Sequence, residues 1–170
     1  GVGNILMGDE GIGVRAIEAL QGRILPPGTR LFDGGTAFQS LTGELEGFDA
    51  LIVIDAIRGG EPPGTIYRFE LEELLEGTED AGMSPGHAVS FSLHDIGVIE
   101  TLTLERLLER RSGVRRMPVK VVLVGIEPAK IERSMELSPT LNKRLPALVE
   151  TVLGELDCAL CTRAHLGSPS

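Results

Sequence analysis

Three side chains in this sequence, Glu10, Asp55 and His94, have the types and the placement for acid–base or metal chemistry. Glu10 lies in a glycine-rich stretch at 1–13, and Asp55 follows the apolar run at 51–54. That run predicts a buried strand, so the Asp55 carboxylate falls at the strand's carboxyl end. In open α/β sheets, ligands bind beyond the carboxyl ends of the strands. The two carboxylates are therefore candidates for one site at that edge.

His94 is the histidine with the most informative position. Ser92 and Asp95 fit a capping box, with Ser92 as the N-cap and Asp95 reaching back to it. His94 then falls in the first helical turn, where the helix dipole disfavours the imidazolium form. A neutral imidazole there is suited to bind a metal or accept a proton. The other two histidines, His87 and His165, fall in a loop and in the tail.

Each candidate also has a purely structural interpretation. Asp9 fits the N-cap of the helix predicted to begin there, and Glu10 fits its first turn. Gly11 and Gly13 argue against capping alone, because glycine weakens a helix start. An aspartate after a strand and a single histidine are both common structural features. Taken together, two carboxylates and one imidazole suit either a divalent metal or a general acid–base pair, and both remain open.

The elements that must position these groups alternate along the chain. The pattern predicts an α/β fold: a three-layer α/β/α sandwich with a mostly parallel, roughly five-stranded twisted sheet. One domain spans 1–170, and we expect its tail from about 158 to be loosely ordered. Strands are predicted at 29–32, 51–54, 65–69 and 119–124, long helices at 10–21, 92–111 and 139–156, and short helices at 38–46 and 70–76.

Three segments bear on the site without belonging to a regular element. Residues 1–4 are typical of a turn after a strand, which predicts a strand upstream of Gly1. The stretch at 76–90 is rich in glycine, proline and acidic residues, so it is either a flap or a plain surface insertion. The first loop is not a dinucleotide fingerprint, since Leu6 stands where glycine is needed, and no GK[ST] follows for a P-loop.

Composition narrows the class of partner. The chain has 170 residues, a net charge of −9 and 42% hydrophobic residues, which is ordinary for a globular protein. The negative charge argues against nucleic acid or an anionic membrane as the main partner. No apolar run approaches the ~20 residues of a membrane span and no signal peptide is visible, so we expect a cytoplasmic protein.

Beyond these patterns, a series of motifs runs along the chain in a fixed order. The first is GVGNILMGDEGIGVRAIEAL at 1–20. It is followed by FDGGT at 32–36, IVIDA at 52–56, SLH at 92–94, VGIEP at 124–128 and LSPT at 137–140. In these motifs the sequence closely resembles the hydrogenase maturation protease family, and the matches extend over nearly the whole chain with consistent spacing.

The resemblance implies a specific activity. Members of this family remove a C-terminal extension from the precursor of the nickel–iron hydrogenase large subunit, once nickel has been inserted. They bind a metal through an acidic residue in the first loop, an aspartate after the third strand and a histidine before the long helix. Those positions fall on Glu10, Asp55 and His94. The resemblance further implies nickel supplied by the substrate, no organic cofactor and the large-subunit precursor as partner, but it indicates no nucleophile.

Other functions are compatible with the same residues. A general metallopeptidase on a related sheet would hold its metal tightly and cut simple peptides. A nickel-dependent binding or chaperone module would bind the precursor without shortening it. A nucleotide-binding module has the least support, since the fingerprint fails. The sequence leaves the oligomeric state open.

Overall fold

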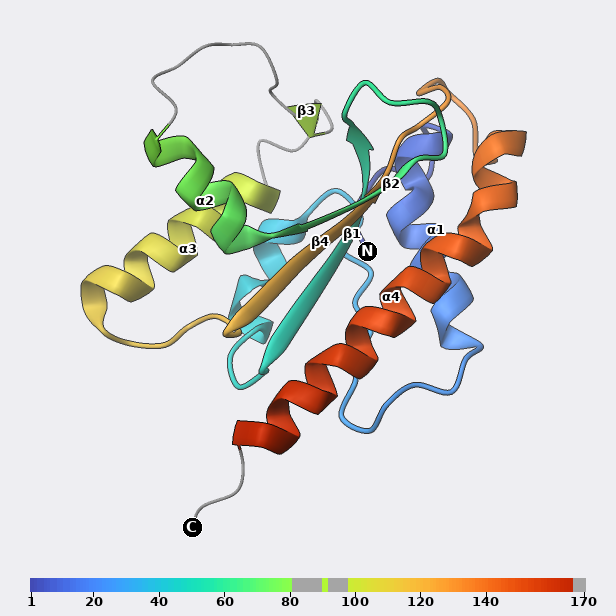
Figure 1. The fold of residues 1–170 in the computed structure, drawn as a ribbon. Helices are drawn as coiled ribbons and strands as arrows, with labels where there is room; N and C mark the ends of the chain where they lie inside the picture. The colour runs from blue at the N-terminus through green and yellow to red at the C-terminus, as the bar shows by residue number, and fades with distance from the viewer. Residues whose placement is uncertain (81–89, 92–97, 167–170) are drawn as a thin grey trace.

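The computed structural model describes residues 1–80, 90–91 and 98–166, which fold around a small twisted sheet (Figure 1). The predicted α/β class is confirmed, and most of the predicted helices and strands are present. In chain order the elements are η1 (Asp9–Gly11), α1 (Ile12–Gln21), η2 (Phe38–Glu44), β1 (Ala50–Arg58), β2 (Ile66–Glu70), α2 (Leu71–Asp80), β3 (Ser90–Phe91), α3 (Val98–Ser112), β4 (Lys120–Ile126) and α4 (Pro139–Leu166).

The sheet has the strand order β2-β4-β1-β3. Its centre is the parallel pair β1 and β4, which runs in register from Ala50 opposite Lys120 to Ala56 opposite Ile126. Strand β2 pairs antiparallel with β4, and the two-residue β3 pairs antiparallel with the end of β1. Three strands therefore make up most of the sheet.

The prediction of a mostly parallel, five-stranded sheet is wrong for the described residues. They contain four strands, and one strand pair is parallel. A parallel connection needs a crossover of a dozen or more residues, whereas only 59–65 separate β1 from β2. So short a link reverses the chain, and β2 enters the sheet antiparallel.

The strand predicted at 29–32 does not form, and this segment is irregular. Its end lies against the first residues of the chain: the Gly1 nitrogen donates to the Phe32 carbonyl at 2.9 Å, and the Gly34 N–H donates to the Gly1 carbonyl at 2.8 Å. An apolar cavity of about 300 Å³ lies along the neighbouring edge of β1, beside Leu31 and Ile52. The strand expected upstream of Gly1 stays a prediction.

Two apolar cores lie on opposite faces of the sheet. Alternate residues of a strand point to opposite faces, so Ile54 joins the core formed with α1 and α4. Val53 joins the core formed with α2 and α3. Figure 1 shows α1 and α4 on one side of the strands and α2 and α3 on the other. Helices therefore pack on both faces of the central strands, and this packing positions the carboxyl ends of β1 and β4.

The helices depart from the predicted bounds at their ends. The first begins as the 3-10 turn η1, and α1 proper starts at Ile12 after Gly11. Helix α4 continues through Leu166, past the point at which we expected a loose tail. Among the described residues, no helix has both the length and the apolar character needed to cross a membrane.

Candidate active site

Glu10 and Asp55 lie buried on two elements that pack together, η1 and β1. Their exposed fractions are 2% and 6%. Asp55 lies opposite Gly125, one rung before the parallel pairing of β1 with β4 ends. Its Oδ1 accepts the Ala56 N–H at 2.7 Å. Because β1 continues to Arg58, Asp55 lies within the strand and not at its end as predicted, but it does lie near the carboxyl end of the parallel ladder.

Close backbone packing brings the first loop against β1. The Val2 N–H donates to the Ile54 carbonyl at 2.9 Å. Gly13 lies so near that a Cβ added to it would be 2.2 Å from the Ile54 carbonyl oxygen and 2.2 Å from that of Val2. Glycine is therefore required at 13 for α1 to start against the strand. Gly13 thus has a structural reason of its own, which weakens the sequence argument that Gly13 counts against a purely structural role for this loop.

Asp9 is the buried residue that fixes the loop carrying Glu10. It is 0% exposed, and its carboxylate accepts three backbone N–H groups. Oδ2 accepts from Ala129 at 2.9 Å and from Lys130 at 3.1 Å, and Oδ1 accepts from Ser138 at 2.7 Å. The prediction that Asp9 caps α1 is wrong, since Gly11 occupies the N-cap and has no side-chain cap bond. Asp9 instead ties η1 to the loop between β4 and α4.

Backbone contacts strengthen this tie between the two loops. The Gly8 N–H donates to the Ser134 carbonyl at 2.7 Å, and the Ser134 N–H donates to Leu6 at 3.1 Å. Gly8 has a φ of 63°, a left-handed conformation that favours glycine. The peptide carrying Glu10 is consequently held from both sides, by β1 and by the segment 127–138.

Glu127 organises the loop that follows β1, a role the sequence analysis missed although Glu127 lies within the quoted VGIEP motif. It is 8% exposed. Its Oε2 accepts the Gly59 N–H at 2.7 Å and the Tyr67 hydroxyl at 2.5 Å. Burial, then the hydrogen bond to Glu127, raises the pKa of Tyr67 to about 12. An acid three residues after the strand predicted at 119–124 was the available sequence signal.

The raised pKa of Tyr67 predicts a loss of stability in alkali. The unfolded phenol ionises near pH 10, whereas the folded phenol keeps its proton to about pH 12, so its stabilising contribution is lost as the pH rises across that interval. At pH 8 we expect Tyr67→Phe to lower the free energy of unfolding by about 1 kcal/mol. At pH 11 the difference in the free energy of unfolding between Tyr67→Phe and wild type should be smaller than at pH 8.

Two measurements check this. Urea denaturation of both proteins at pH 8 and pH 11 gives this difference, and a constant difference would contradict the assignment. Tyr67 is the only tyrosine in the chain, so the absorbance of tyrosinate reports its pKa directly. A midpoint near 10 in the folded protein would show that neither burial nor the bond to Glu127 raises the pKa of Tyr67.

His94 lies outside the described residues, as does most of the predicted 76–90 loop. The described residues on either side of it, Phe91 and Val98, both lie beside β1. Phe91 pairs with Ile57, and Val98 lines a small cavity together with Asp55. Within the described part of the chain, no three histidine, cysteine or acidic side chains gather as a metal site. The three-residue set of Glu10, Asp55 and His94 stays a prediction.

Comparison with known proteins gives this geometry a context. A family model described as hydrogenase maturation protease matches residues 14–155, a range that includes Asp55 and His94 but not Glu10. The chain is 36% identical over 159 residues to the hydrogenase 2 maturation protease of Escherichia coli K12. That alignment covers 92% of this chain and 87% of the relative.

Solved structures agree with the sequence matches. The hydrogenase maturating endopeptidase HybD from E. coli superposes with a TM-score of 0.72 at 36% identity, over 92% of this chain and 89% of that one. The [NiFe] hydrogenase maturation protease HybD from Thermococcus kodakarensis gives 0.66 at 28% identity, over 89% and 92%. Both the fold and the sequence are therefore similar along most of the chain.

Proposed function

The chain belongs to the hydrogenase maturation protease family, and we propose that it cuts its substrate with Glu10, Asp55 and His94 as the working groups. Family membership makes it an endopeptidase that removes the C-terminal extension of a hydrogenase large-subunit precursor. The proposed substrate is the nickel-loaded precursor of a nickel–iron hydrogenase. The proposed metal is the substrate's own nickel.

The observation that carries the proposal is the pair of buried carboxylates at one end of the parallel strands. Burying an acidic side chain costs free energy, so two of them on packed elements, Glu10 on η1 and Asp55 on β1, are typical of a site that uses them. The surrounding backbone is rigid. Asp9 fixes the loop of Glu10, and the register of β1 with β4 fixes Asp55. Two oxygen donors are thus oriented before any substrate arrives.

His94 supplies the third donor in this proposal. Its neighbours Phe91 and Val98 lie beside the same end of β1, and only six residues separate them. A neutral imidazole with two carboxylates suits nickel and leaves coordination positions for ligands that the precursor contributes. In this arrangement the three side chains grip the nickel of the precursor, orient the precursor's C-terminal segment and hold the scissile bond in one place.

The proposal is tested by incubating the protein with purified precursor and weighing the product. One precursor sample comes from nickel-fed cells and the other from nickel-starved cells. We expect loss of a single C-terminal peptide from the nickel-loaded sample alone. An unchanged precursor mass in both samples would contradict the proposal.

The same samples separate the two rival functions. A general metallopeptidase would also cut the nickel-free precursor, or an unrelated peptide, once a metal salt is added. A binding or chaperone module would co-elute with the precursor on size exclusion while the precursor mass stayed constant. Cleavage confined to the nickel-loaded precursor contradicts both.

A further inference from the structure

The outer face of α3 combines exposed leucines with exposed arginines. Leu104, Leu107 and Leu108 are 56%, 48% and 39% exposed, and their spacing puts them on one side of the helix. Arg111 continues this side one turn later, and Arg110 flanks it. These five residues are called the α3 docking face below. The opposite side of α3 is buried in the core through Val98 and Leu102.

Exposed apolar side chains concentrate in this region. In the described part of the chain nine large apolar residues are clearly exposed, and five of them lie between 104 and 119. Single exposed leucines need no explanation, but three adjacent ones on a helix form a patch, and such patches typically mark an interaction surface.

The charge of the region is opposite to that of the protein. The whole chain carries −9, yet four arginines fall within the seven residues 110–116. All four are exposed. Neither Arg110 nor Arg111 forms an ion pair with any described carboxylate, and the nearby Glu109 faces inward to Arg106. The face is therefore a basic, apolar patch on an acidic molecule.

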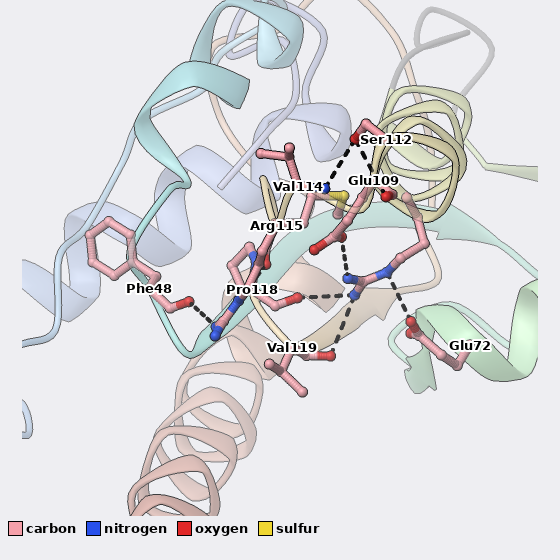
Figure 2. Close-up of polar contacts among 10 residues, drawn as sticks. Phe48, Glu72, Glu109, Ser112, Val114, Arg115, Pro118 and Val119 are labelled. Carbon is pink, nitrogen blue, oxygen red and sulfur yellow. Dashed lines mark hydrogen bonds and ion pairs between the residues drawn. The ribbon is translucent and has the colours of Figure 1, made fainter.

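A buried arginine ties the helix that carries this face to the neighbouring segments. Arg106 is 8% exposed, and its partners Glu72, Glu109 and Pro118, which Figure 2 labels, belong to three segments. Its Nε lies 3.0 Å from Glu72 on α2, its Nη1 lies 2.9 Å from Glu109, and its Nη2 donates to the Pro118 carbonyl at 3.0 Å. Helix α3 is thereby clamped to α2 and to the start of β4. A preordered surface loses little conformational entropy when a partner binds.

The docking face lies at the far end of α3 from the candidate active site. Val98, the first residue of α3, lies beside Asp55. The loop after the last turn of α3 lies near the start of β1, because Arg115 in this loop donates to the Phe48 carbonyl at 3.1 Å. Fifteen helical residues span about 22 Å. A substrate that occupies the candidate site and also contacts this face must therefore extend over about 22 Å, roughly the length of seven extended residues.

We propose that the α3 docking face binds the folded body of the protein substrate, through carboxylates that surround apolar side chains on the substrate's surface. This inference rests on the proposed function. Complementary charge favours an acidic protein. A second copy of this chain would bring arginine against arginine if the same face were shared. A nucleic acid would be bound at its phosphates by polar groups of the protein, so the three central leucines would have no apolar surface to contact. An anionic bilayer would meet the same local basic charge, and the vesicle measurement described below tests it.

The test is the steady-state cleavage of nickel-loaded precursor by the variant Arg110→Glu/Arg111→Glu. We expect KM to rise at least tenfold with kcat unchanged, because the site itself is intact. The matched control is Arg23→Glu/Lys143→Glu, which makes the same change in net charge on the α1 and α4 side of the molecule. Its KM should stay within threefold of wild type. Wild-type KM should also rise with salt, and that dependence should weaken in the docking-face variant.

A second variant guards against loss of folding. Leu104→Gln/Leu107→Gln removes the apolar part without reversing charge, and it should also raise KM alone. Unchanged KM in both docking-face variants overturns the inference. Three further measurements on wild type test the other occupants: binding to phosphatidylserine vesicles, binding to duplex DNA, and self-association by sedimentation. The inference is overturned if wild type shows any of these interactions and either docking-face variant abolishes it. Failure of wild type to cut the precursor is a different result, since it overturns the proposed function itself.

Discussion

Asp55→Asn is expected to lower cleavage of the nickel-loaded precursor by roughly 100-fold or more while the protein stays folded. Asparagine has nearly the same shape as aspartate and keeps an Oδ1 that can accept the Ala56 N–H. What it loses is the negative charge, which both a nickel-binding group and a general acid–base group need. Cleavage is measured as precursor mass against time, and folding by circular dichroism.

Glu10→Gln should give a loss of similar size, because Glu10 lies on the element packed against β1. The matched control is Glu18→Gln, which removes an acid from the exposed side of α1, where it pairs with Arg15. That control should cut precursor at the wild-type rate. Normal cleavage by both Asp55→Asn and Glu10→Gln would show that the site lies elsewhere, even though the family is correct.

Binding measurements on these variants separate the two chemical roles. If Asp55 grips the nickel of the substrate, Asp55→Asn should bind the nickel-loaded precursor more weakly, and the preference over nickel-free precursor should shrink. If Asp55 transfers a proton, the variant should bind both forms as wild type does and lose only kcat. We expect weaker binding of the nickel-loaded precursor, since the proposed role of Asp55 is to bind the nickel of the substrate.

The sequence predicted the elements of this protein better than their pairing. Hydrophobic runs located both central strands, and the 3.6-residue period located α1 and α4. The direction of β2 was missed, because it depends on the short 59–65 link and on pairing with β4, which lies over 50 residues further along. The segment 29–32 has strand-like composition, but composition does not provide a neighbour with which to pair.

The same distinction applies to the candidate site. Asp55 was found because its position after an apolar run is a local signal. The role of Asp9 was missed because its three partners lie 120 or more residues away, and a local pattern favoured capping. The close approach at Gly13 was missed for the same reason, since Ile54 belongs to another element. His94 stays a prediction, supported by the placement of Phe91 and Val98 beside β1.

Asp9→Ala is expected to destabilise the fold by about 3 kcal/mol or more, a large share of the stability of a domain of this size. The substitution leaves three N–H donors without their acceptor, and the donor of Ser138 is buried. Asp9→Asn should cost less than Asp9→Ala. It can still accept from Ser138, but its amide would face the Ala129 and Lys130 donors.

Urea denaturation measures these losses, and a second residue of the same loop provides the control. Glu132→Ala removes an exposed acid paired with Lys130, which should change the free energy of unfolding by less than about 1 kcal/mol. Because Asp9 holds the peptide next to Glu10, cleavage by Asp9→Asn should fall even at temperatures where the variant is fully folded. Full activity in the folded Asp9→Asn protein would contradict this positioning role, and a loss of stability no larger than that of Glu132→Ala would contradict the structural one.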